Sequence, residues 1–149
     1  MIRRPATGFW LFCLLALAAC SSERATRAGD LEIAQVRVMR PPTPDETAGY
    51  LTVHNRGSVA DTLVEVSSPV ASMVMIHRQV MANGRGTMEH VAALEIPARG
   101  AIVLEPGGVH LMLMGITRRL EVGDTVPLAL TFRRGGTVNV VAAVRPYGD

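Results

Sequence analysis

Cysteine, lysine and aromatic residues are scarce in this sequence, and each scarcity excludes a class of protein. The two cysteines, Cys13 and Cys20, both lie in the N-terminal segment, so the rest of the chain offers no disulfide, no thiolate metal ligand and no cysteine nucleophile. All 15 basic residues are arginine, and half of the aromatic residues precede Cys20. No segment shows a clear 3.6-residue hydrophobic period, which argues against a helical fold.

The charge balance does not point to a nucleic-acid-binding protein. The formal net charge of +2 comes from Arg3 and Arg4, while residues 20–149 carry equal numbers of arginine and acidic residues. A balanced surface lacks the basic footprint of a nucleic-acid-binding domain. The length suits one domain. The sequence shows no H-E-x-x-H, no glycine-rich phosphate loop and no recognisable Ser-His-Asp arrangement, so we expect a protein that is not an enzyme.

The N-terminal segment has the pattern of a bacterial export signal. A basic start, MIRR, precedes an apolar run at residues 8–19, which is too short to span a bilayer. The run ends in LAAC at residues 17–20; this resembles a lipobox and implies cleavage before Cys20 and a lipid anchor on its sulfur. An ordinary secretory signal is the alternative.

The expected organisation of the chain follows from this signal. We expect export to the bacterial periplasm and anchoring to the inner or the outer membrane as a lipoprotein. The expected parts are a lipoprotein signal peptide at 1–19, the lipidated Cys20 with a flexible tether at 20–30, and a folded domain at 31–149.

Period-two alternation of Val, Leu, Ile and Thr runs through most of residues 31–144. Turns rich in glycine, proline and asparagine separate the alternating segments, and the glycines at 84 and 86 suit a hairpin turn. The pattern predicts an antiparallel β-sandwich or barrel. The expected strands are 31–39, 48–55, 62–67, 71–81, 87–93, 101–104, 109–114, 125–133 and 137–144.

Histidine and methionine gather on two of these strands. His110 and Met112 share one strand face and Met114 continues it. Cα atoms two residues apart on a strand are separated by about 6.7 Å, so two such side chains reach one ion. A sheet face exposed to water has no reason to be rich in methionine. The same alternation occurs upstream, at Met73, Met75 and His77.

The hairpin register decides whether Met88 belongs to the same face. If Met81 pairs with Gly86, then His77 faces His90 and Met88 is the diagonal neighbour of His77. A register shifted by one residue would place His77 and Met88 on opposite faces. Joint ligation by these two residues therefore requires the first register, or a loop position for one of them.

The donor chemistry favours a soft monovalent metal. A thioether is a soft, neutral ligand that selects Cu(I) over Zn, Mg or Ca. An imidazole must be unprotonated to bind, so affinity is expected to fall in acid. A thioether cannot close into a disulfide, although it can oxidise to the sulfoxide.

This arrangement resembles the periplasmic copper chaperones of the PCu(A)C type. Their signature is His, ten residues, Met, twenty-one residues, His, one residue, Met, and the chain matches it without a gap. The matching positions are His77, Met88, His110 and Met112. Further similar segments are AGYLTVHN at 48–55, Ile96-Pro97, PGGVHLMLM at 106–114 and EVGD at 121–124. The resemblance covers roughly residues 31–144.

The resemblance implies a cupredoxin-like antiparallel β-sandwich that binds one Cu(I). It implies a chaperone that delivers copper to an acceptor such as the CuA centre of cytochrome c oxidase, and a separate copper donor. The implied Cu(I) ligands are His77, Met88, His110 and Met112. The other expected partner is the membrane, through Cys20, with no nucleic acid and with the chain as a monomer.

Two departures from the family pattern stand out. Many members have Met directly after the first His, whereas this chain has Arg78, for which Met75 is a candidate substitute. Some members carry a C-terminal tail rich in His and Met; this sequence ends in RPYGD, so a second Cu(II) site on such a tail is not expected.

Other histidines and methionines have simpler expected roles. Methionine on strands usually fills gaps in a core, and this is the role expected for Met39 and Met73. Surface or edge positions are expected for His54 and Met81. The candidates for additional ligands or site lining are Met75, Met114 and His90.

Two other functions compete with copper delivery. An electron-transfer cupredoxin would use a His₂Cys set, and no cysteine follows Cys20, so rapid redox cycling is disfavoured. A structural or interaction lipoprotein without metal would have no copper affinity and would tolerate His110→Ala.

Overall fold

The structure is a computed structural model that describes residues 25–82 and 84–147. The expected signal peptide and Cys20 lie outside the described residues. Within them the secondary structure consists of strands, and no helix is long and apolar enough to cross a membrane. The strands are β1 (Thr26–Ala28), β2 (Leu31–Met39), β3 (Glu46–Asn55), β4 (Asp61–Ser67), β5 (Ala71–Ala82), β6 (Arg85–His90), β7 (Leu94–Ile96), β8 (Ala101–Leu104), β9 (Val109–Ile116), β10 (Thr125–Phe132) and β11 (Gly136–Arg145).

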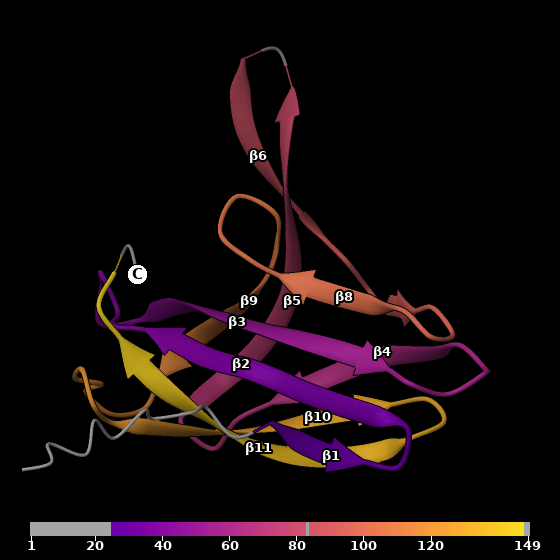
Figure 1. Ribbon diagram of the computed structural model, residues 1–149. Coiled ribbons are helices and arrows are strands. Elements are labelled where there is room, and N and C mark those ends of the chain that lie inside the picture. The colour runs from indigo at the N-terminus through magenta and orange to yellow at the C-terminus, as the bar shows by residue number, and fades with distance from the viewer. Residues whose placement is uncertain (1–24, 83, 148–149) are drawn as a thin grey trace, which may run out of the picture.

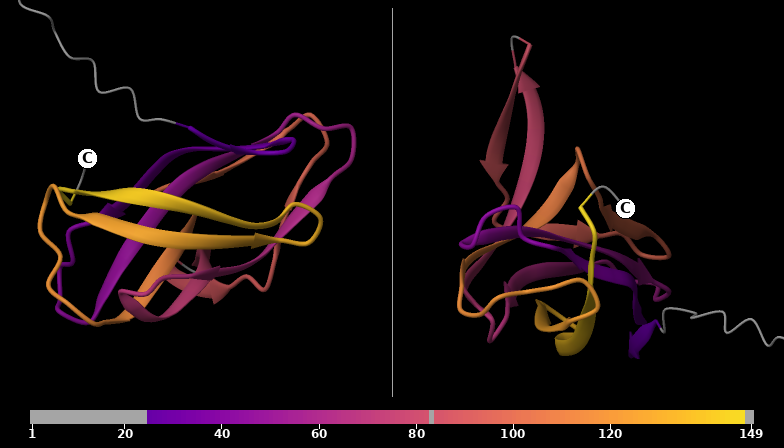
Figure 2. Two further views of the ribbon diagram at one scale, coloured as in Figure 1. Left: turned by 90° about the horizontal axis from the view of Figure 1, so that it is seen from below. Right: turned by 90° about the vertical axis from the view of Figure 1, so that its left-hand side faces the viewer.

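The strands form one hydrogen-bonded sheet that folds over on itself (Figures 1 and 2). Its order is β6-β5-β9-β3-β2-β11-β10-β4-β7, with β1 added to β2 and β8 added to β3. The β2–β11 pair is parallel, and the other pairs are antiparallel. The sandwich is therefore antiparallel, as expected, except at one pair of strands, where β11 runs parallel to β2.

The sequence alternation predicts the long strands within about two residues and misses the two short ones. β1 lies inside the expected flexible tether, where it pairs with β2 through Thr26↔Ile33 and Ala28↔Leu31. Three residues are too few for alternation to be visible. β7 pairs with β4 and follows a strand that ends at His90, three residues before the expected end at 93.

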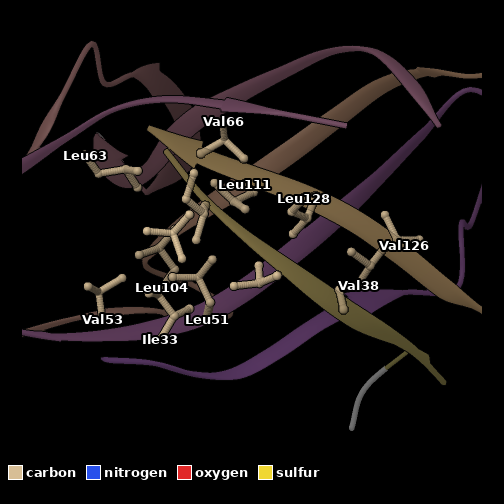
Figure 3. Packing of buried hydrophobic residues seen from close by; sticks show 14 of the residues in the cluster. Ile33, Val38, Leu51, Val53, Leu63, Val66, Leu104, Leu111, Val126 and Leu128 are labelled. Atoms are coloured by element: carbon tan, nitrogen blue, oxygen red, sulfur yellow. The ribbon is translucent and has the colours of Figure 1, made fainter. Parts of the chain in front are cut away.

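The core lies between the two layers of the folded sheet (Figure 3). Alternate residues of β10 from Val126 to Phe132 are at most 2% exposed, whereas Thr125 before them and Pro127 between them are exposed. Leu111 and Leu113 of β9 are fully buried in the same core. Burial of each such leucine contributes roughly 1.5–3 kcal/mol. These two leucines fix which face of β9 points inward, and hence which face carries His110 and Met112.

The β5–β6 hairpin stands out from the sandwich (Figures 1 and 2). All six residues of β6 are exposed, and β6 pairs only with β5 among the described strands. The pairing Met81↔Gly86 sets the register and brings His90 opposite His77, as the first of the two registers considered above requires. Backbone bonds from Val91 N to Ile76 O (2.8 Å) and from Gln79 N to Gly108 O (3.1 Å) hold the base of the hairpin to the sheet.

Candidate metal centre

Three adjacent strands, β6, β5 and β9, bring the histidines and methionines onto one face of the sheet. Directly opposed residues of antiparallel strands share a face. The opposed pairs include His77↔His90 and Gln79↔Met88 across the hairpin, and His77↔His110, Met75↔Met112 and Met73↔Met114 between β5 and β9. We call this surface the His/Met face; its members are Met73, Met75, His77, Met88, His90, His110, Met112 and Met114.

His77 lies at the centre of the His/Met face. Its ring centroid is 6.1 Å from that of His110 and 6.3 Å from that of His90, and both pairs are close to perpendicular. Its Nδ1 atom is buried and has no hydrogen-bond partner within the described residues. Burial, followed by the charges of His110 and His90, lowers the pKa of His77 below its usual value of 6.5. A buried imidazole nitrogen with a free lone pair at neutral pH is ready to bind a metal ion.

His110 is buried and oriented by the turn that precedes β9. It is 6% exposed, and its Nδ1 is 3.2 Å from the carbonyl oxygen of Gly108. Gly107 adopts φ +78° in this turn, a conformation that glycine takes without strain. When Nδ1–H donates to Gly108 O, the lone pair of Nε2 remains available, which is the usual arrangement of a metal-binding histidine.

Met112 continues the His/Met face one row below His110. It is partly buried and directly opposes Met75 on β5. Each of these methionines lies two residues along its own strand from a histidine, which is about 6.7 Å. His77, His110, Met75 and Met112 therefore form a compact block of two imidazoles and two thioethers.

Met88 lies one row further toward the hairpin tip. It opposes Gln79, is diagonal to His77 and is 56% exposed. With about 4.8 Å between strands and about 3.4 Å per residue, Met88 and Met112 are about 10 Å apart across the strands and about 13 Å along them. The structure thus brings His77, His110 and Met112 together and leaves Met88 on the projecting hairpin.

The remaining histidines and methionines divide between predicted and unexpected positions. Met39 is 2% exposed and belongs to the buried hydrophobic residues, His54 is exposed, and Met81 is 70% exposed, so these three predictions are confirmed. The prediction of a core role for Met73 is wrong: it is 53% exposed on the His/Met face. Side chains alternate between the two faces along β5, so Met73 lies on the same face as Met75 and His77. This alternation outweighs the usual preference of methionine for cores.

The donor set of this face is rich in sulfur. No group of three His, Cys, Asp or Glu side chains within the described residues is placed to hold a metal ion. Methionines Met75 and Met112 lie in the row next to His77 and His110, so they can supply further ligands to a metal bound there. This combination favours Cu(I) over harder ions. Arg78, in place of the family's methionine, is exposed and points to neither ring, since it lies on the alternate side of β5.

Sequence comparisons relate the chain to lipoproteins. A family model described as LpqE-like, a lipoprotein family, matches residues 31–144. A protein from Leifsonia xyli subsp. xyli, named "Putative lipoprotein Lxx21020", is 31% identical over 136 residues, which make up 91% of this chain and 81% of that protein.

Solved structures with the same fold include copper-bound ones. The solution structure of apo-DR1885 from Deinococcus radiodurans is 31% identical with a TM-score of 0.63, over 99% of this chain and 97% of that one. The CuI-DR1885 structure is 33% identical with a TM-score of 0.64, over 89% and 87%. The copper-bound PCuAC domain from PmoF2 has a TM-score of 0.71 at 23% identity, over 83% and 98%. The all-β, cupredoxin-like fold is thereby confirmed.

Proposed function

Since the chain belongs to the LpqE-like lipoprotein family and has the fold of PCuAC domains, we propose that it binds one Cu(I) and delivers it to an acceptor protein. The proposed ligands are His77, Met88, His110 and Met112. The acceptor we propose is a copper centre such as CuA of cytochrome c oxidase. A relative of known structure, DR1885, has been solved with Cu(I) bound.

The observation that carries this proposal is the buried Nδ1 of His77, which has no hydrogen-bond partner in the part of the chain that the structure describes. A buried polar atom without a partner costs about 1–3 kcal/mol, and proteins normally pair such atoms. The side chains around His77 are two more imidazoles and methionines of the same face, and none of them hydrogen-bonds to this atom among the described residues. A bound soft cation would use this lone pair.

The mixed exposure of the proposed ligands suits transfer rather than permanent storage. His110 is buried and fixed by Gly108, whereas Met88 is 56% exposed on a hairpin attached to the sheet along one edge. An acceptor can replace an exposed ligand first while the buried ones still hold the ion. Two-stranded ribbons twist more than the strands of larger sheets, so bending of the hairpin over His77 would bring Met88 to the ion.

The cellular setting belongs to the same proposal. Cleavage at the lipobox-like sequence would leave Cys20 as the lipid-anchored first residue of a periplasmic protein. The folded domain would act as a monomer, receiving copper from a donor and releasing it to the acceptor. No catalytic step is needed for this role.

The test is an anaerobic Cu(I) competition titration of the protein against its His110→Ala/Met112→Ala double variant. We expect the protein to bind one equivalent tightly and the variant to lose that binding while keeping its fold, checked by circular dichroism. The matched control is His54→Ala, a histidine at an exposed strand position. Tight binding retained in the folded double variant would refute the ligand assignment, whereas no tight binding by the unaltered protein would favour a lipoprotein without metal.

A further inference from the structure

The His/Met face continues beyond the proposed copper ligands. Met75 and Met112 form the row next to the histidines, and Met73 and Met114 form the row after that. Directly opposed residues have Cβ atoms about 4.5–5.5 Å apart, so two opposed methionines can direct both sulfurs at one ion. From the histidine row to the Met73–Met114 row is about 13 Å along the strands.

Packing does not explain this last row. The inward face of the same two strands carries Ile76, Leu111 and Leu113, each at most 5% exposed. Met73 points the other way and is 53% exposed, and Met114 is partly buried. The exposed Met73 gains little from burial at this position, while thioethers are soft ligands for Cu(I).

A carboxylate lies beside the pair. Glu46 of β3 directly opposes Met114 on the side away from Met73, so it belongs to the same face. It is partly buried, and none of the ion pairs among the described residues involves it. The negative charge of this carboxylate would attract a cation bound at the methionine pair.

From these observations we propose a second Cu(I) site formed by Met73 and Met114, with Met75 as the third donor. This site is distinct from the histidine site and does not depend on it. Met75 and Met112 lie between the two, so a copper ion can move from one row to the next by exchanging one thioether at a time. Because Met73 is exposed, a copper ion in the last row would be accessible to ligands from another protein.

The experiment uses the full-length chain in detergent, with Cys13→Ser and Cys20→Ser so that no thiol binds copper. Methionine methyl groups are labelled with carbon-13, and Cu(I) is added anaerobically. We expect two equivalents to bind, the second of them shifting the methyl signals of Met73 and Met114. The variant Met73→Leu/Met114→Leu should keep the first equivalent and lose the second.

The control is Met81→Leu, which removes a methionine that is more exposed than Met73 and faces Gly86 rather than another sulfur; it should retain both equivalents. Unchanged methyl signals of Met73 and Met114 up to two equivalents, or a second equivalent still bound by the double variant, would overturn the proposal. Shifts at Met73 and Met114 without any change at Met112 or Met88 would instead support the second site and refute the histidine site.

Discussion

Replacing His77 by leucine separates the stability of the protein from its affinity for copper. Leucine removes the buried Nδ1 that has no partner within the described residues and leaves an apolar side chain of similar size. An unsatisfied buried polar atom costs about 1–3 kcal/mol. We therefore expect His77→Leu to raise the free energy of unfolding of the metal-free protein by about 1 kcal/mol, or Tm by about 3–4 °C.

The same variant should lose its response to copper. At a free Cu(I) concentration of about 100 times Kd, the natural protein gains about 2.7 kcal/mol from binding, whereas His77→Leu should gain none from the histidine site. The assay is thermal unfolding of both proteins with and without one equivalent of Cu(I), with His54→Leu as the control at an exposed histidine. A metal-free variant that is less stable than the natural protein would show that Nδ1 is satisfied, and the reasoning would be wrong.

Two further predictions concern pH and the methionines. Burial lowers the pKa of His77 below 6.5, so the unfolded chain takes up a proton first as pH falls, and the metal-free protein should lose stability between pH 6.5 and that lowered pKa; urea unfolding from pH 8 to 5 checks this. Cu(I) affinity should fall as the pH drops, because both proposed histidine ligands must be unprotonated to bind. Among single leucine variants, Met112→Leu and Met88→Leu should each weaken Cu(I) binding, because both are proposed ligands, whereas Met81→Leu should not, because its exposed side chain faces Gly86 nearer the hairpin tip. Competition titrations measure this, and unchanged binding by Met88→Leu would show that Met88 does not reach the ion from the projecting hairpin.

Local alternation in the sequence reveals most of the fold because long strands repeat every two residues. It places the inward residues Leu111 and Leu113, and it therefore places His110 and Met112 outward. It cannot detect β1, which is three residues long, or the parallel pairing of β2 with β11, which joins segments more than 100 residues apart. Such pairings depend on how the whole chain packs.

In the candidate site, too, local features could be predicted from the sequence and long-range strand pairings could not. The donor types follow from the sequence, which leaves two hairpin registers open between His77 and His90, and the structure has the one in which Met81 pairs with Gly86. The pairing of β5 with β9 joins His77 to His110 across more than 30 residues, and spacing along the chain cannot show it. Glu46 was missed for this reason: it reaches Met114 through the β3–β9 pair and has no local signal.

The measurement that tests the central claim most directly is X-ray absorption at the copper edge of the protein loaded anaerobically with one equivalent of Cu(I). The account predicts a first coordination shell that contains both imidazole nitrogen and thioether sulfur. In His77→Leu the nitrogen contribution should fall. A shell of sulfur alone, or of nitrogen and oxygen without sulfur, would contradict a Cu(I) site made by the histidines and methionines of this face.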